Sequence, residues 1–246
     1  MSIAEKFEVI ADAVYEKGIE KGKKDEYDKF WDNFQNYGKR TKYSHAFTGY
    51  GWNTYNFYPK YDIKPNEGTY IFRAWEHSSS DYKFSLKQRL EECGVKLDTS
   101  NVKAFDATFS YNVEFTEIPT IDLTSATSIS NLFTWNYGAL KTIEKLIVNE
   151  NTPMGDWFVG SPGVENITIE GTIGKRGFNI SPCTKLSGQS IVSIIEALSD
   201  TTSGLTVTLS QTAVNNMAFP IVGNKGTYNS WTDLEQSKTN WTISLV

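Results

Sequence analysis

The sequence predicts an α+β fold: a short repeat solenoid with a parallel sheet on one face, preceded by an N-terminal helix and an aromatic-rich cap. Three observations lead to this prediction. Apolar residues recur at fixed offsets in the middle of the chain, aromatic residues gather before them, and helical apolar spacing comes first. The recurring apolar residues are Phe115, Ile118, Ile121 and Leu123; Leu140, Ile143, Leu146 and Val148; and Val164, Ile167 and Ile169.

The offsets within the first two copies are 3, 3 and 2, and the second copy repeats the first at an offset of 25. The third copy keeps the offsets 3 and 2, and it follows at an offset of 21 when Val164 is aligned with Ile143. Such periods are typical of leucine-rich repeats, which stack into a solenoid. We therefore expect a leucine-rich-repeat solenoid of about four to five repeats over residues 85–212.

Residues 1–37 are predicted to form a helical segment. Ile3, Phe7, Ile10 and Val14 follow one another at offsets of 4, 3 and 4, which gives an apolar seam over two heptads. This seam either packs on its own domain or serves oligomerisation or docking to a larger assembly. Two heptads are too short to hold partners together alone.

Residues 38–84 are predicted to cap the N-terminal end of the solenoid. Eleven aromatic residues fall between Tyr43 and Trp75. A solenoid exposes its first core layer unless a cap covers it, and this segment has the position and the apolar content of such a cap. The alternative is that one or two of these rings are exposed and stack on sugars.

Within the repeat region we expect a helix over 86–93, a strand over 177–180, a helix over 190–198 and a strand over 205–209. Val95 and Leu97 fit the strand of a first copy, at the positions that Ile121 and Leu123 occupy in the next. Residues 213–246 should form a C-terminal cap that closes with a strand over 241–245. We expect the Asn151 side chain to bond loop backbone, and Cys183 to take the equivalent position in a later repeat. We also expect Cys93 and Cys183 to be buried, reduced thiols.

Composition excludes several classes of function. The 246 residues carry a net charge of −5 with no basic stripe, which argues against nucleic acid as a partner. No stretch approaches the roughly 18 apolar residues of a membrane span. Acidic residues interrupt the apolar positions of residues 1–20, so we expect no secretory signal and synthesis in the cytoplasm.

The inventory of reactive side chains predicts no enzyme, no cofactor and no metal site. The only histidines, His45 and His77, lie far apart in the sequence and match no metal-ligand motif. Without a positioned base, the serines have no means of activation as nucleophiles. The paired carboxylates, such as Glu91 and Glu92, fall on predicted helices, where solvent exposure is the default.

Several segments carry a resemblance to a known group of proteins. They are the stretch IAEKFEVIADAVYEKGIEKGKKDEYDKFWDNFQNYGKRTKYSHAF, followed by GYGWNTYNFYPKYDIKP, NITIEGTIG, IIEALSDTTSGLTVTL and NWTI. The chain resembles the BspA-like leucine-rich-repeat proteins. More specifically, it resembles small leucine-rich-repeat proteins encoded in the structural or tail regions of phages and prophages of gut Firmicutes. The resemblance implies a virion-associated or surface-exposed binding protein, and it names no ligand.

We therefore expect a phage receptor-binding or accessory protein that recognises a bacterial surface protein or polysaccharide. The alternatives are a structural virion component that contacts other virion proteins, and a bacterial surface adhesin. Trp157 has a second interpretation, in which it packs beneath the repeat turn. The expected contact residues lie on the outward strand positions and in the repeat loops: Asp122, Thr124, Trp135, Tyr137, Asn149, Trp157, Thr168 and Glu170.

Overall fold

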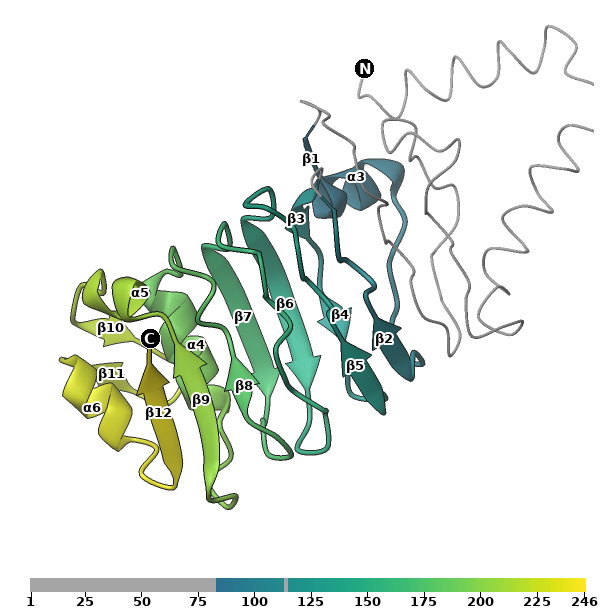
Figure 1. The fold of residues 1–246 in the computed structure, drawn as a ribbon. Coiled ribbons are helices and arrows are strands. Elements are labelled where there is room, and N and C mark those ends of the chain that lie inside the picture. Colours follow the sequence, from purple (N-terminus) through teal and green to yellow (C-terminus); the bar gives the residue numbers. More distant parts are fainter. Residues whose placement is uncertain (1–82, 113–114) are drawn as a thin grey trace, which may run out of the picture.

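The chain winds into a parallel β-solenoid of about four turns with few helices (Figure 1). The computed structural model describes residues 83–112 and 115–246. The predicted helical segment 1–37 and nearly all of the predicted cap 38–84 lie outside the described residues. The predicted solenoid itself is confirmed.

A five-stranded parallel sheet forms one face of the solenoid. β6 is its centre, because β3, β4 and β7 all pair with it, while β1 pairs with β3. The eleven apolar residues of the predicted repeat pattern are all buried, with at most 5% of their surface exposed. The strands of this face are β1 (Phe84–Ser85), β3 (Phe115–Ile118), β4 (Ile121–Asp122), β6 (Thr142–Val148) and β7 (Asn166–Gly171).

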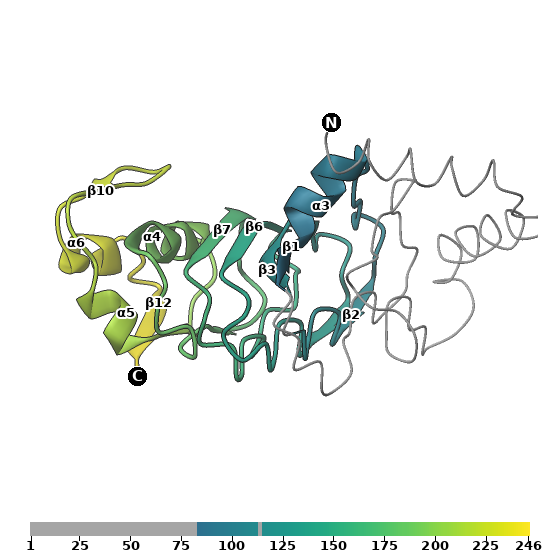
Figure 2. The same ribbon diagram turned by 90° about the horizontal axis from the view of Figure 1, so that it is seen from above.

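The opposite face carries smaller sheets (Figure 2). In each turn the chain therefore runs along one face, passes around the core to the other face and then returns. β2 pairs with β5 near the N-terminal end, and β9 pairs with both β8 and β12 near the C-terminal end. The predicted strands over 177–180, 205–209 and 241–245 are confirmed. The strands of this face are β2 (Ala104–Asp106), β5 (Ser128–Ser130), β8 (Phe178–Asn179), β9 (Leu205–Leu209) and β12 (Trp241–Leu245).

The predicted spacing of the third repeat is wrong. The repeat pattern aligns Ile167 with Leu146, whereas in the sheet Ile167 pairs with Ile143, and Leu146 pairs with Ile169. The register shifts between these pairs because three steps along β6 oppose two steps along β7. A bulge of this kind absorbs one extra residue and keeps the apolar side chains of both strands facing the core.

Local signals explain the helix α3 (Leu86–Cys93), whose bounds match the prediction. The hydroxyl of Ser85 accepts a hydrogen bond from the Gln88 N–H and caps the N-terminus. Gly94 ends the helix in the left-handed conformation, with φ of 66°. The predicted helix over 190–198 is also confirmed, as α4 (Gly188–Ala197).

α4 occupies the position beside β7 where the next strand of the sheet would lie. The Ile167 N–H donates to the Ser190 hydroxyl at 2.9 Å, and the Ile169 N–H donates to the Ser193 hydroxyl at 2.8 Å. Two serines on a buried helix therefore satisfy the edge of β7, which would otherwise leave buried donors without acceptors.

The C-terminal cap packs on the same core as the repeats. The buried carboxylate of Glu196 on α4 accepts hydrogen bonds from the Asn224 N–H, the Lys225 N–H and the Tyr228 hydroxyl. These bonds tie α4 to a hairpin of this cap. Its elements before β12 are α5 (Gln211–Asn215), β10 (Ile221–Val222), β11 (Thr227–Tyr228) and α6 (Trp231–Gln236).

A stack of phenylalanines runs through the core along the solenoid axis. The rings of Phe109 and Phe133 lie 5.6 Å apart, and those of Phe133 and Phe158 lie 5.2 Å apart, both nearly parallel. Phe178 continues the series edge-on at 6.1 Å from Phe158. One ring from each successive turn thus fills the interior between the two faces.

A buried polar ladder lies beside this stack. The Asn112 N–H donates to the Asn136 side-chain oxygen at 2.9 Å, and the Asn136 N–H donates to the Ser161 hydroxyl at 3.1 Å. The Asn136 amide also donates to the Phe133 carbonyl. The Cys183 thiol donates to the Ser161 carbonyl at 3.4 Å, so Cys183 occupies the next position of this ladder and is equivalent to Asn136 and Ser161, whereas the sequence predicted equivalence with Asn151.

Two smaller predictions need correction. Asn151 is exposed and takes no part in the ladder, because it lies in the turn after β6. Both cysteines are free, but only Cys183 is buried, whereas Cys93 is half-buried at the end of α3. Burial raises the pKa of both thiols.

The ladder makes a prediction about stability. We expect Asn136→Ala to lower the free energy of unfolding by about 2 kcal/mol, because the buried Asn112 N–H loses its acceptor. Urea denaturation measures the change. Asn151→Ala, at an exposed position, is the matched control and should leave stability unchanged. Equal effects of the two substitutions would contradict the assignment.

A second prediction concerns the edge of β7. Ser193→Ala should cost about 1–3 kcal/mol, because the Ile169 N–H is then left without an acceptor. Ser203→Ala, at an exposed serine before β9, is the control. Hydrogen exchange should show faster exchange at Ile169 in the Ser193 variant alone; unchanged exchange would argue against the capping role.

Candidate functional site

Asp122 and Thr124, expected to contact a ligand, are used within a turn at the end of β4. The Asp122 carboxylate accepts hydrogen bonds from the Thr124 N–H at 2.8 Å and from its hydroxyl at 2.6 Å. Both residues are half-buried, and the turn occupies Oδ1 of Asp122 and the hydroxyl of Thr124. They therefore stabilise the loop.

The same turn forms one repeat earlier, at Asp98 and Ser100. The Ser100 N–H and hydroxyl donate to the Asp98 carboxylate at 3.1 and 2.6 Å. Asp98 is thus equivalent to Asp122, which makes Leu97 the equivalent of Ile121. The predicted first copy is wrong in register, because it aligned Leu97 with the later of the two strand positions.

Asn149 has an equivalent role after β6. Its amide donates to the Thr124 carbonyl at 2.7 Å, and its side-chain oxygen accepts from the Asn151 N–H at 2.8 Å. Asn149 therefore bonds the loop backbone, which is the role predicted for Asn151. This turn also links two successive repeats.

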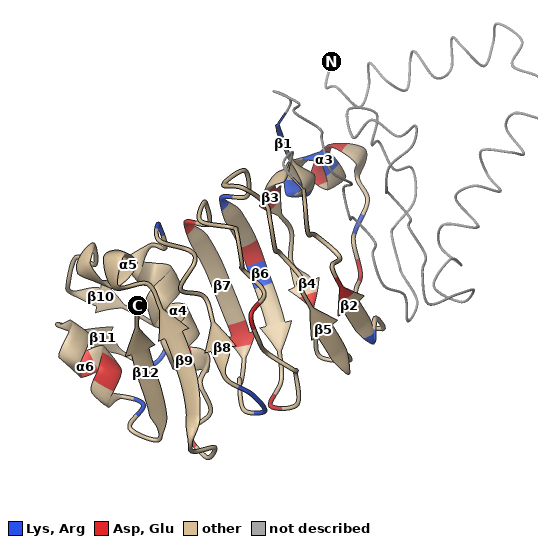
Figure 3. Cartoon of the chain, viewed as in Figure 1, with Lys and Arg blue, Asp and Glu red and all other residues tan. Residues whose placement is uncertain are grey.

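Thr168 and Glu170 are exposed on the large sheet, as expected, and Glu170 is one of several paired charges on this face. Glu170 lies 2.5 Å from the Lys145 ammonium, and Glu165 lies 3.5 Å from that of Lys141. β6 carries both an acidic and a basic residue, whereas the one charged residue within β7 is acidic (Figure 3). This face thus presents no patch of a single sign on these strands.

Glu144 shows how closely these charges are coupled. Its carboxylate lies 3.2 Å from the Lys87 ammonium and accepts two hydrogen bonds from Thr120. Burial raises the pKa of Glu144, but the bonds from Lys87 and Thr120 outweigh it and hold this pKa below its ordinary value. The Glu144 carboxylate is therefore occupied by Lys87 and Thr120, which lie earlier in the chain.

The prediction that Trp157 contacts a partner is wrong. Its side chain is only 1% exposed, and it packs edge-on against Phe178 at 5.5 Å. The alternative interpretation, packing beneath the repeat turn, is confirmed. The indole N–H has no acceptor within the described part of the chain.

Trp135 and Tyr137 are exposed, with 39% and 65% of their surfaces accessible. Their rings lie 6.0 Å apart, and the ring of Tyr111, from the preceding turn, stacks on Trp135 at 6.5 Å. We call these three side chains the aromatic edge. Two of the expected contact residues are thus brought together with a third that was not among the predicted ones.

All three residues of the aromatic edge have left-handed backbone conformations. The φ angles are 56° at Tyr111, 59° at Trp135 and 45° at Tyr137. A residue other than glycine in this region costs roughly 1–3 kcal/mol. The next turn has Gly160 at the position equivalent to Trp135, with φ of 68°.

Gly160 also leaves the space that the Trp135 ring occupies, because it has no side chain. A Cβ atom at Gly160 would lie 2.5 Å from Cε3 of Trp135, which is closer than carbon atoms approach. The indole therefore lies directly against the backbone of the following turn. One of its faces is held by the protein, and part of the ring remains accessible.

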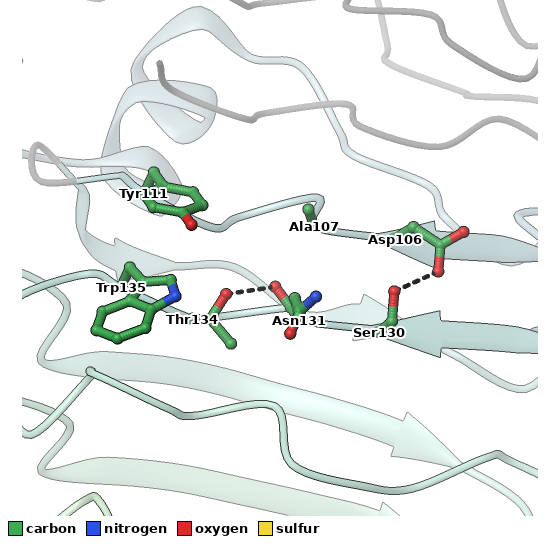
Figure 4. A pocket seen from close by; sticks show the side chains of 7 residues that line it. All are labelled: Asp106, Ala107, Tyr111, Ser130, Asn131, Thr134 and Trp135. Atoms are coloured by element: carbon green, nitrogen blue, oxygen red, sulfur yellow. Dashed lines mark hydrogen bonds between the residues drawn. The ribbon is translucent and has the colours of Figure 1, made fainter. Parts of the chain in front are cut away.

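A depression of about 270 Å³ adjoins the aromatic edge (Figure 4). The Asp106 carboxylate lies at one end and the Trp135 ring at the other. One Asp106 oxygen accepts hydrogen bonds from the Ser130 hydroxyl at 2.7 Å and the Ser128 hydroxyl at 3.3 Å. The described residues that line the depression are Asp106, Ala107, Tyr111, Ser130, Asn131, Thr134 and Trp135.

The chain was compared with protein-family models, curated proteins and solved structures, and none of them matches it. Among residues 83–112 and 115–246, no three His, Cys, Asp or Glu side chains gather as metal ligands would. No helix in that part of the chain is long and apolar enough to cross a membrane.

Tyr111 and Asp106 were missed, although the sequence contains a signal for the first. Phe109, Tyr111 and Asn112 recur in the next turn as Phe133, Trp135 and Asn136. This second repeat motif sets one aromatic above the next. Asp106 carries no such signal, because its place beside Ser130 depends on the pairing of β2 with β5.

The contact between Gly160 and Trp135 can be measured by substitution. Gly204 is the matched control, because its φ of 74° is similar but no atom lies within 4 Å of the place that a Cβ would take. Gly204→Ala should cost about 1–2 kcal/mol from the left-handed conformation alone. Gly160→Ala should cost more, because it also displaces the indole.

The double variant Trp135→Gly/Gly160→Ala separates the two effects. In the absence of the indole, the cost of Gly160→Ala should fall to that of Gly204→Ala in urea denaturation. An unchanged cost would mean that the Trp135 ring does not rest on Gly160.

Proposed function

We propose that the solenoid is a non-enzymatic binding module that recognises a bacterial surface polysaccharide through the aromatic edge. One observation carries this proposal: Tyr111, Trp135 and Tyr137 are held together in left-handed conformations on the rim of a polar depression. Backbone strain of this kind is concentrated at ligand sites, where the surrounding structure maintains it.

Trp135 occupies a position of the turn where glycine would be more stable. Gly160 follows at the same place in the next turn and adopts the same conformation without the penalty of a side chain. Stability alone thus favours glycine at this position of the turn. An exposed tryptophan at the strained position is readily explained if its ring contacts a ligand.

The backbone beneath the aromatic edge is already ordered. The N–H groups of Tyr111, Trp135 and Tyr137 donate to carbonyls of the following turn at 2.9, 2.8 and 3.1 Å. Rings that are fixed before binding lose little conformational entropy when a ligand arrives. This preorganisation favours binding through a small contact area.

The size of the site favours a saccharide over a protein partner. A stable protein interface needs about 800 Å² from each partner. The large apolar side chains exposed in the described part of the chain are few, and apart from Trp135 and Tyr137 they are single valines. A depression of about 270 Å³ edged by aromatic rings suits one or two sugar rings.

We place this module on a phage particle, where it would attach the particle to its host. This setting rests on the resemblance of the chain to small proteins of phage structural regions. A purely structural virion protein or a bacterial adhesin are the competing roles, and the predicted helical segment 1–37 would provide docking or oligomerisation.

The proposal predicts the loss of binding on removal of the rings. Trp135→Gly and Tyr137→Gly keep the left-handed backbone conformation and should each weaken binding to host cells or their extracted polysaccharide at least tenfold. Val222→Ala, an exposed apolar residue on β10, is the control. Isothermal titration and cell pull-down measure the effect.

If both glycine variants bind as tightly as the wild-type protein, the aromatic edge is not the binding site. A protein that binds no cells or polysaccharide, yet is present in purified particles, would favour the structural virion role.

A further inference from the structure

We propose that the depression beside the aromatic edge selects an uncharged sugar, with Asp106 as the residue that determines this specificity. The inference rests on the proposed function, and it adds the chemical class of the ligand. It follows from the two ends of the depression and from the charges around it (Figure 4).

Asp106 is held in a fixed orientation. The hydroxyls of Ser128 and Ser130 both donate to Oδ1, at 3.3 and 2.7 Å. These serines stand on β5, which pairs directly with β2, so the backbone register sets the distance. The second carboxylate oxygen has no hydrogen-bond partner within the described part of the chain, and it can accept from a ligand.

A carboxylate accepts hydrogen bonds and donates none, so the ligand group that it binds must be a donor. Sugar hydroxyls are donors of this kind. The exposed side-chain amide of Asn131, between Asp106 and Trp135 in the lining, supplies both a donor and an acceptor. The depression thus offers polar partners along one side of a sugar ring.

The Trp135 and Tyr111 rings complete the site at its other end. The C–H face of a sugar packs against an aromatic ring, while its hydroxyls project from the rim. An aromatic surface at one end and a carboxylate at the other match these two parts of one sugar unit. The arrangement accepts a ring that lies flat on Trp135 and directs a hydroxyl to Asp106.

Charge then decides which sugars fit. Of the described residues that line the depression, Asp106 alone is charged, and none is Lys, Arg or His. An acidic sugar or a sugar phosphate would bring a second negative charge next to Asp106 with no lining cation to offset it. Two negative charges placed next to each other repel, so the depression should exclude acidic polymers.

The test uses the full chain and affinity electrophoresis through gels that contain polysaccharide. The neutral probes are glucan, galactan and mannan, and the acidic probes are polygalacturonate and hyaluronate. We expect retardation by at least one neutral polymer and by neither acidic one. Retardation by none of the neutral polymers, or by an acidic one more strongly, would overturn the inference.

Two carboxylate variants sharpen the result. Asp106→Asn should weaken binding of the neutral polymer about tenfold, because a charged acceptor is lost while the shape is kept. Asp156→Asn is the matched control, since Asp156 is an exposed aspartate that also accepts a side-chain hydrogen bond, from Asn179 at 2.8 Å. Urea denaturation checks that both variants keep the wild-type fold.

Failure of this inference and failure of the proposed function give different results. If Trp135→Gly abolishes binding while Asp106→Asn leaves it unchanged or strengthens it, the aromatic edge binds a ligand and the selection by Asp106 is wrong. If Trp135→Gly has no effect on binding, the proposed function itself fails.

Discussion

The fold depends on the backbone hydrogen bonds that join each turn of the solenoid to the next. They form the sheet on one face, the shorter pairings on the other, and single bonds through the loops between them. Because equivalent residues of successive turns must lie side by side, one type of side chain stacks on its own kind. The phenylalanine stack, the buried asparagine ladder and the aromatic edge all arise from this one constraint.

The same constraint separates the scaffold from the site. Polar groups at the strand ends are used by turns, as at Asp122 and Asn149, and charges on the large sheet are paired across strands. These surfaces support the fold and have few groups left for a ligand. The aromatic edge differs, because its residues adopt a conformation that costs energy and leave ring surface exposed. The region where the scaffold is most strained is therefore the strongest candidate site.

Local patterns could be predicted from the sequence, whereas positions set by pairing could not. The helix Leu86–Cys93 follows from Ser85 and Gly94 at its ends, and the strand Trp241–Leu245 follows from its apolar alternation. The register of the third repeat was missed because its offsets of 3 and 2 fit two alignments with β6, and only the strand pairing selects the one that contains a bulge. Trp135 and Tyr137 were selected as loop aromatics, but Trp157 has the same local character and lies inside the core. The packing of the neighbouring turns determines whether such an aromatic side chain is exposed or buried.

The helix beside β7 has a consequence for assembly. An exposed edge of a parallel sheet is a template on which a strand of another molecule can add. Here the Ser190 and Ser193 hydroxyls already occupy the donors of Ile167 and Ile169, and a helix covers the place a foreign strand would take. The large sheet is thus closed to polymerisation at this end.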